Sequence, residues 1–247
     1  CDGVNHNIID IVEDRQLNNL IEYFSRYTLE ARNSVENIVI DMYSPYVSLV
    51  DRIFPKAKIS IDRFHLVQLV NRAFNKTRIT VMKKYIKKNT PLYNKLKKYW
   101  KLFLKPYAEL SYERKMYCRS FKRYISQKEI IDYLLEQDKE ILDAHEAYQD
   151  FHYAIKKRSF EKFKIALEEH KHIENQYLKT SIKTFNKYLS FIQNSLKYEY
   201  SNGPIEGINN KIKVIKRIAF GYRSFLNLRR RIFISCNLIN IKGTLSA

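Results

Sequence analysis

Cysteine is scarce in this 247-residue chain, and its three cysteines form no pattern. Cys1, Cys118 and Cys236 are far apart in the sequence, and the chain contains no CxxC pair. This usage argues against a disulfide framework and against a thiolate zinc site, and it is typical of proteins in a reducing cytoplasm. Long apolar runs are missing too. No stretch of about eighteen apolar residues occurs and the start shows no signal-peptide pattern, so we expect no membrane role.

Acidic residues are few in comparison with basic ones. The chain has 45 Lys and Arg against 26 Asp and Glu, which gives a formal net charge of +19. Such an excess favours a polyanionic partner, and nucleic acid is the leading class. Apolar residues make up 45% of the chain, enough for one or two cores, so we expect the charge to sit on a folded protein.

Short β-branched runs near the start of the chain predict a parallel sheet, in a fold of the α/β class. The runs lie at 8–12, 38–40 and 59–61, and helical patterns lie between them at about 16–32 and 46–54. Strands that alternate with helices pair in parallel, and continuous apolar runs indicate that both faces of the sheet are covered.

The rest of the chain, from Asp62 on, shows no convincing strand and reads as a succession of amphipathic helices rich in Tyr and Lys. We expect breaks between these helices near 89–91, 105–106, 126, 159 and 201–204. The organisation predicted from these patterns is a sheet-containing core at 1–89, a helical insertion at 90–200 and terminal helices at 201–247.

Two carboxylates follow neighbouring predicted strands. Asp41 ends the run NIVID and Asp62 ends KISID, so both are expected at the carboxyl edge of the sheet, where ligands of open α/β folds gather. The alternative is that each Asp starts a turn or caps the next helix. His65 follows Asp62 at a spacing that places both on one helix face, where it would orient a carboxylate, contact a phosphate or pack as a structural residue.

A third carboxylate, Glu206, opens a helix predicted to start at Gly203 and Pro204. The expected apolar stripe of this helix is Ile205, Ile208, Ile212, Ile215 and Ala219. Glu206 shares the polar stripe with Asn210, Lys213 and Arg217. An acid in a first helical turn is favoured by the helix dipole alone. Its functional alternative is a metal ligand that stays ionised among the cations below it.

Carboxylates of this kind suit phosphodiester chemistry. Two divalent cations held by acidic side chains activate a water or hydroxyl and stabilise the leaving oxygen. Oxygen ligands favour Mg²⁺ or Mn²⁺, and two ions are expected in a complete site, which typically needs three acids.

Cations crowd the last two predicted helices, with Phe220, Tyr222 and Phe225 among them. The alternative to a DNA-binding surface is a solvated cationic face with core aromatics, whereas stacking aromatics between cations suit exposed bases. The cations expected to bind DNA are Lys211, Lys213, Lys216, Arg217, Arg223, Arg229, Arg230 and Arg231.

Two long segments of the sequence resemble the ISL-three family of bacterial insertion-sequence transposases. They are IVIDMYSPYVSLVDRIFPKAKISIDRFHLVQLVNRAFNKTR at 38–78 and SNGPIEGINNKIKVIKRIAFGYRSFLNLRRRIF at 201–233. The resemblance implies an RNase H-like DDE core with a helical insertion before its last catalytic helix. It makes Asp41 the second metal-binding acid and Glu206 the third, with Asp62 and His65 as site-adjacent residues.

The resemblance also implies cut-and-paste DNA transposition, with DNA (terminal inverted repeats and target DNA) as partner. It further implies a homo-oligomer assembled on DNA and a bacterial cytoplasmic location at the nucleoid. The family's first acid has no matching context here, and none of Asp2, Asp10 and Asp14 fits it. Because the chain opens on CDGVNHN without Met, we expect a fragment of a longer reading frame, and its own enzymatic activity stays open. The alternatives are an inactive DNA-binding remnant and another RNase H-like nuclease.

Overall fold

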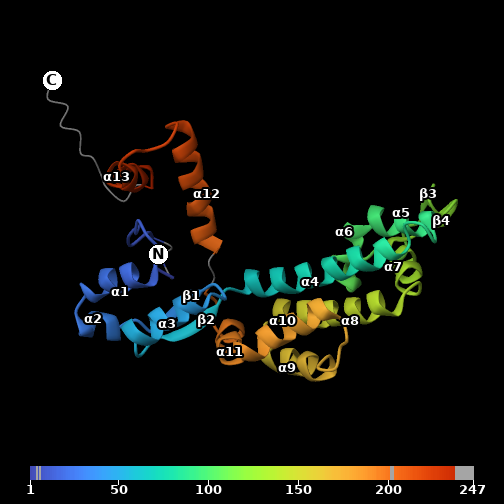
Figure 1. Ribbon diagram of the computed structural model, residues 1–247, viewed down its shortest axis with the longest axis horizontal. Helices are drawn as coiled ribbons and strands as arrows, with labels where there is room; N and C mark the ends of the chain where they lie inside the picture. Colours follow the sequence, from blue (N-terminus) through green and yellow to red (C-terminus); the bar gives the residue numbers. More distant parts are fainter. Residues whose placement is uncertain (4, 6, 201–202, 237–247) are drawn as a thin grey trace. The chain divides into compact units, whose positions relative to one another are not determined.

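The computed structural model describes residues 1–3, 5, 7–200 and 203–236 (Figure 1). The chain divides into two compact units. One, here called the sheet unit, combines Cys1–Asp62 with the segment that begins at Glu199, and the other, the helical unit, is Arg63–Tyr198. Most described residues are helical, and two small sheets complete the structure. Within the described part of the chain, no helix combines the length and the apolar character that crossing a bilayer requires.

The sheet unit is built around two parallel strands. β1 pairs with β2 in a register that sets Ile40 opposite Ile61, and the helix between them, α3, packs against β1 and α1. Ile40, Val50 and Ile61 are buried in its core. The elements of this unit are α1 (Leu17–Ser25), α2 (Leu29–Asn33), β1 (Asn37–Ile40), α3 (Ser44–Ile53), β2 (Lys58–Ile61), α12 (Gly203–Ile218) and α13 (Phe225–Ser235).

The strand expected at 8–12 is not formed, and that prediction was wrong. Within the described residues the two strands of this unit pair only with each other, and 8–12 forms no ladder with either of them. Side chains fix the segment instead, because the Tyr23 hydroxyl and the Arg229 guanidinium both bind the Asp10 carboxylate. β-branched residues fit a pleated surface, but a strand also needs a partner strand.

The helices of the sheet unit lie where the sequence predicts them, except that one predicted helix is two separate helices. The expected helix at 16–32 is split into α1 and α2, because Thr28 caps a new helix by accepting a hydrogen bond from the Ala31 N–H at 3.2 Å. The helix expected from Gly203 is confirmed as α12. Residues 201 and 202 of the predicted loop lie outside the described residues.

The helical unit has a core of aromatic side chains around α4 and α8. Phe74 stacks on Tyr148 at 5.2 Å between ring centroids. Phe151, Phe163 and Phe185 are fully buried and pack against one another. The elements are α4 (Arg63–Lys84), α5 (Thr90–Lys98), α6 (Trp100–Phe103), η1 (Tyr107–Glu109), β3 (Met116–Cys118), β4 (Arg123–Ile125), α7 (Gln127–Leu135), α8 (Lys139–Lys156), α9 (Phe160–Glu169), α10 (Gln176–Lys187) and α11 (Leu189–Lys197).

Predicted helix breaks coincide with capping residues. Ser126 forms a capping box with Glu129 at the start of α7, and Ser159 caps α9. The expectation of no strand after Asp62 was wrong, since β3 and β4 form an antiparallel hairpin. Strands of three residues are too short to show the alternation by which strands are predicted. The functional division into core, insertion and terminal helices stays a prediction.

Candidate active site

Asp41 and Asp62 leave adjacent parallel strands at the same end. β1 and β2 are in register up to Ile40 and Ile61, and the Asp62 N–H donates to the Ile40 carbonyl at 3.0 Å. The ladder therefore extends to the position where both acids stand, on strands about 4.8 Å apart. Asp62 is buried and Asp41 is half-buried. The sequence prediction that both follow the carboxyl ends of neighbouring parallel strands is confirmed for these strands.

The local structure distinguishes the two acids. After Asp41 the chain turns, with the Tyr43 N–H donating to the Asp41 carbonyl at 2.7 Å, and the N-cap position of α3 is occupied by Tyr43. Asp41 therefore starts a turn, as one form of the alternative predicts, and it does not occupy the cap position of α3. Asp62 directly precedes the first residue of α4, a position where Asp is favoured as a cap, so the capping alternative stays open for it.

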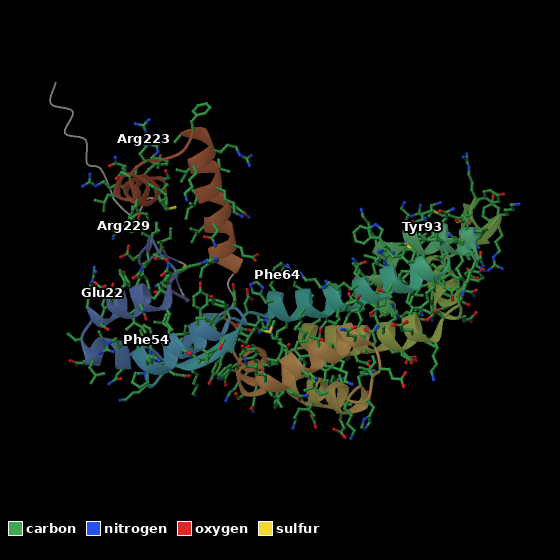
Figure 2. All side chains as sticks on the ribbon, viewed as in Figure 1. Glu22, Phe54, Phe64, Tyr93, Arg223 and Arg229 are labelled. Carbon is green, nitrogen blue, oxygen red and sulfur yellow. The ribbon has the colours of Figure 1, made fainter. Side chains whose placement is uncertain are left out.

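His65 lies in the first turn of α4 and is half-buried. Its ring packs edge-on against Phe64, with 5.6 Å between the ring centroids. Phe64 itself is 49% exposed, and it is labelled in Figure 2. The packing contact fits the structural alternative for His65, and its partnership with Asp62 stays a prediction.

Glu206 is exposed in the first turn of α12. It is the acidic residue of that turn, while Lys216 and Arg217 occupy the last turn, so both ends of the helix carry the charge that the helix dipole favours. The carboxylate is open to solvent and could accept a ligand. Its convergence with Asp41 stays a prediction.

Two of the predicted DNA-binding cations form contacts within the protein. Lys211 donates to the Ser235 carbonyl, which ties α12 to α13. Arg229, labelled in Figure 2, reaches from α13 to Asp10, and its Nη2 lies 2.7 Å from Asp10 Oδ1. The other predicted cations are exposed and form no ion pair within the described residues, and they are Lys213, Lys216, Arg217, Arg223, Arg230 and Arg231.

The Asp10 carboxylate is fully engaged by the protein. Partial burial alone would raise its pKa, but hydrogen bonds from Tyr23, the Ile11 N–H and Arg229 outweigh it, and the pKa of Asp10 is lowered. The same contact, together with burial, raises the pKa of the Tyr23 hydroxyl. Asp10 is therefore an unfavourable choice for the missing first acid, which agrees with its unsuitable sequence context.

A second group of metal-ligating residues lies in the helical unit and was missed by sequence reasoning. One ligand atom each from Asp150, Glu169 and His170 lies within 4.8 Å of the others. His170 Nε2 is 2.8 Å from an Asp150 carboxylate oxygen, and this hydrogen bond accounts for the closeness of the two. The residues come from α8 and the end of α9, and no motif spacing in the sequence connects them.

Comparisons with known proteins identify a family and a relative of this chain. Residues 1–232 match the sequence model of the ISL-three transposase family, described as a transposase. A protein of Lactococcus lactis subsp. lactis named "ATP-dependent protease" is 40% identical over 111 residues, which make up 45% of this chain and 36% of that protein. The match thus spans about a third of the length of that relative. No solved structure matches the chain.

Proposed function

This chain belongs to the ISL-three transposase family, and from that premise we propose that it is the metal-dependent catalytic part of an insertion-sequence transposase. In this proposal β1 and β2 are part of an RNase H-like core, and the helical unit is inserted before the last catalytic helix, α12. The observation that carries it is the pair of acids at one edge of a parallel sheet, with the Asp62 N–H bonded to the Ile40 carbonyl. Loops and helix starts converge at such an edge.

The residues present fit a hard divalent cation. Asp41 and Glu206 offer carboxylate oxygens, which Mg²⁺ and Mn²⁺ prefer, and neither the described structure nor the sequence puts a thiolate beside them. When bound, two such ions activate a water and stabilise the leaving oxygen of a phosphodiester. Asp41 and Glu206 would hold the ions, and the main chain of Asp62 would keep the end of β1 in place.

The exposed cations of α12 and α13 would hold DNA next to Glu206. Lys213 and Arg217 are four residues apart on α12, so they lie on one face of that helix. On this proposal the reaction is hydrolysis of the phosphodiester at the ends of the element, followed by attack of the freed 3′-hydroxyl on target DNA. Terminal inverted repeats and target DNA are the partners, and a homo-oligomer would assemble on them.

The name of the Lactococcus relative suggests a different activity. ATP-dependent proteolysis requires a nucleotide-binding part, and the common form is a GxxxxGK[ST] loop whose backbone N–H groups hold the phosphates. No such loop occurs in these 247 residues, which contain five glycines in all. No observation on this chain favours proteolysis, and the family match over 1–232 favours transposition.

Iron-mediated backbone cleavage tests the proposed metal site without requiring turnover. Fe²⁺ replaces Mg²⁺ at oxygen sites, and with ascorbate and peroxide it cuts the chain beside its ligands. We expect cuts next to Asp41 and next to Glu206, competed by Mg²⁺. Asp41→Asn and Glu206→Gln should each abolish both cuts, because the two acids hold the same ions.

The matched controls are Asp51→Asn and Glu22→Gln, which remove exposed acids from α3 and α1 of the same unit. They should leave the pattern unchanged. Cuts confined to the region of Asp150, Glu169 and His170 would contradict the proposal. An unchanged pattern in Asp41→Asn would also contradict it, and it would favour the inactive remnant.

A further inference from the structure

The excess of basic over acidic residues in the chain comes from two segments. Residues 201–247 carry nine Lys and Arg with one acid, and residues 83–128 carry fifteen Lys and Arg with two acids, Glu109 and Glu113. The remainder of the chain holds 21 Lys and Arg against 23 acids. The segment 83–128 therefore has the largest excess of positive charge in the protein, and the proposed site at Asp41 and Glu206 does not use it.

The β3–β4 hairpin presents an aromatic pair from this segment to solvent. Tyr117 lies opposite Tyr124 in the antiparallel register, with ring centroids 5.5 Å apart and an angle of 64° between the ring planes. The side chains alternate between faces, so both tyrosines are on one face and Cys118 and Ile125 are on the other. Ile125 is buried, whereas Tyr117 is 58% and Tyr124 is 70% exposed.

The hairpin is held rigidly on the helical unit. The hydroxyl of Tyr99, which follows α5, lies 2.7 Å from Cys118 Sγ and 2.7 Å from Ser120 Oγ. Phe121 packs edge-on against Tyr133 of α7, and the Lys95 ammonium lies 4.3 Å from the centre of the Phe121 ring. Figure 1 shows β3 and β4 beside α5 and α7, and Tyr93 marks α5 in Figure 2. A fixed hairpin presents its rings with little loss of entropy on binding.

Cations of the hairpin and its flanks have no acidic partners among the described residues, with one exception. Arg114, Arg119, Lys122 and Arg123 are exposed, and none forms an ion pair within the described residues. Lys115 is the exception, since it pairs with Glu129 at 3.2 Å. Exposed rings and cations on one short hairpin match the chemistry of a nucleic-acid strand, whose phosphates bind the cations and whose bases stack on the rings.

We propose that the β3–β4 hairpin is a second DNA-binding surface, which holds an unpaired stretch of DNA by stacking bases on Tyr117 and Tyr124. Arg114 before the hairpin and Arg119 and Lys122 at its turn bind the phosphates of the same strand, whereas Arg123 pairs with Cys118 on the opposite face. This inference rests on the proposed function for the identity of the polyanion as DNA. The bases must be unpaired, because the faces of paired bases are covered by their neighbours in the duplex.

A comparison of two DNA ligands tests the stacking. Fluorescence anisotropy with the 247-residue chain measures binding to a blunt duplex and to the same duplex with a short single-stranded extension. We expect the extended duplex to bind more tightly. Replacing both tyrosines by Ala should weaken binding of the extended duplex at least about fivefold, the effect of one lost stacked base, and leave binding of the blunt duplex unchanged.

Two control variants distinguish the loss of stacking from misfolding of the helical unit. Tyr117→Phe with Tyr124→Phe retains both rings and should restore the preference for the extension. Tyr153→Ala removes a tyrosine of α8 that is 47% exposed and should have no effect. Loss of the preference in the Phe variant, or its persistence in the Ala variant, would overturn the proposal.

The salt dependence of DNA binding tests whether the cations of the hairpin bind phosphates. Replacing Arg114, Arg119 and Lys122 by Gln should lower the slope of log affinity against log salt by about 2 for the extended duplex, at about 0.7 per single-strand phosphate. The matched control removes three exposed lysines of α10, Lys179, Lys183 and Lys187, and should leave the slope unchanged. An equal fall in both triple variants would mean that only net charge matters and would refute the surface.

The outcomes separate this inference from the proposed function. If the Ala variant binds both duplexes like the unaltered chain while iron still cuts beside Asp41 and Glu206, the hairpin surface is wrong and the metal site stands. If the tyrosines are needed for binding to vesicles of anionic lipid and not for binding to DNA, the surface recognises lipid phosphate and the proposal is refuted.

Discussion

The Asp10 carboxylate joins three parts of the sheet unit, and its removal has a stability cost that the geometry allows us to work out. The Tyr23 hydroxyl of α1 donates to one carboxylate oxygen at 2.5 Å, and Arg229 of α13 approaches the other at 2.7 Å. A hydrogen bond to a charged group contributes about 1.5 kcal/mol. The Arg229 side chain is 38% exposed, so solvent screening limits its ion pair to about 0.5 kcal/mol. We therefore expect Asp10→Ala to lower the unfolding free energy of this unit by about 2 kcal/mol.

Hydrogen exchange in urea measures this loss separately for the two units. The amides of β1 and β2 report on the sheet unit, and those of α8 report on the helical unit. Asp10→Ala should accelerate exchange in β1 and β2 and leave α8 unchanged. Because the pKa of Asp10 is lowered in the folded state, its contribution is constant from pH 7 down to about 4 and is lost as the pH falls further.

The reasoning would be refuted by an equal change in α8, or by a contribution that grows as the pH falls below about 4. Arg229→Gln gives a second check. It should reduce the stability of the sheet unit by about 0.5 kcal/mol, because this arginine is used within the protein. Arg223→Gln should leave stability unchanged and weaken DNA binding instead.

Three further predictions concern the helical unit and the DNA-binding surface. Burial lowers the pKa of His145 to about 4, so the unfolding free energy of the helical unit should fall by up to about 3 kcal/mol as the pH drops from 6.5 to 4. His145→Gln should remove this pH dependence, measured by urea unfolding with Trp100 fluorescence as the signal. Ser126→Ala removes the capping box of α7 and should cost about 1 kcal/mol in the same assay, whereas Ser190→Ala, an exposed change in α11, should cost nothing measurable. Binding to duplex DNA should weaken steeply with salt, and a flat response in anisotropy would contradict a role for the cations.

The sequence was most informative where periodicity and position act together. The runs ending in Asp41 and Asp62 predict parallel strands with acids at one edge, and the structure has both. The helix opened by Gly203 is likewise confirmed. These features depend on local pattern and on the rule that connected parallel strands share a direction, so they can be predicted without coordinates.

Features that depend on distant partners could not be predicted. The segment 8–12 has strand composition but no partner strand among the described residues. The contact of Arg229 with Asp10, 219 residues away, has no signal in the sequence around either residue. The β3–β4 hairpin is too short for a periodic signal and is fixed by a contact from Tyr99. In each case a long-range contact overrides the local pattern, which propensity does not encode.

Manganese binding, measured by electron paramagnetic resonance, tests most directly whether Asp41 and Glu206 hold the same ions. Free Mn²⁺ is counted during titration of the unaltered chain, of Asp41→Asn, of Glu206→Gln and of the double variant. Shared ligation predicts that each single variant loses as much Mn²⁺ binding as the double variant does, because one missing ligand already disables a common site. Independent losses that add up in the double variant would mean that the two acids act apart, and the proposed chemistry would be contradicted.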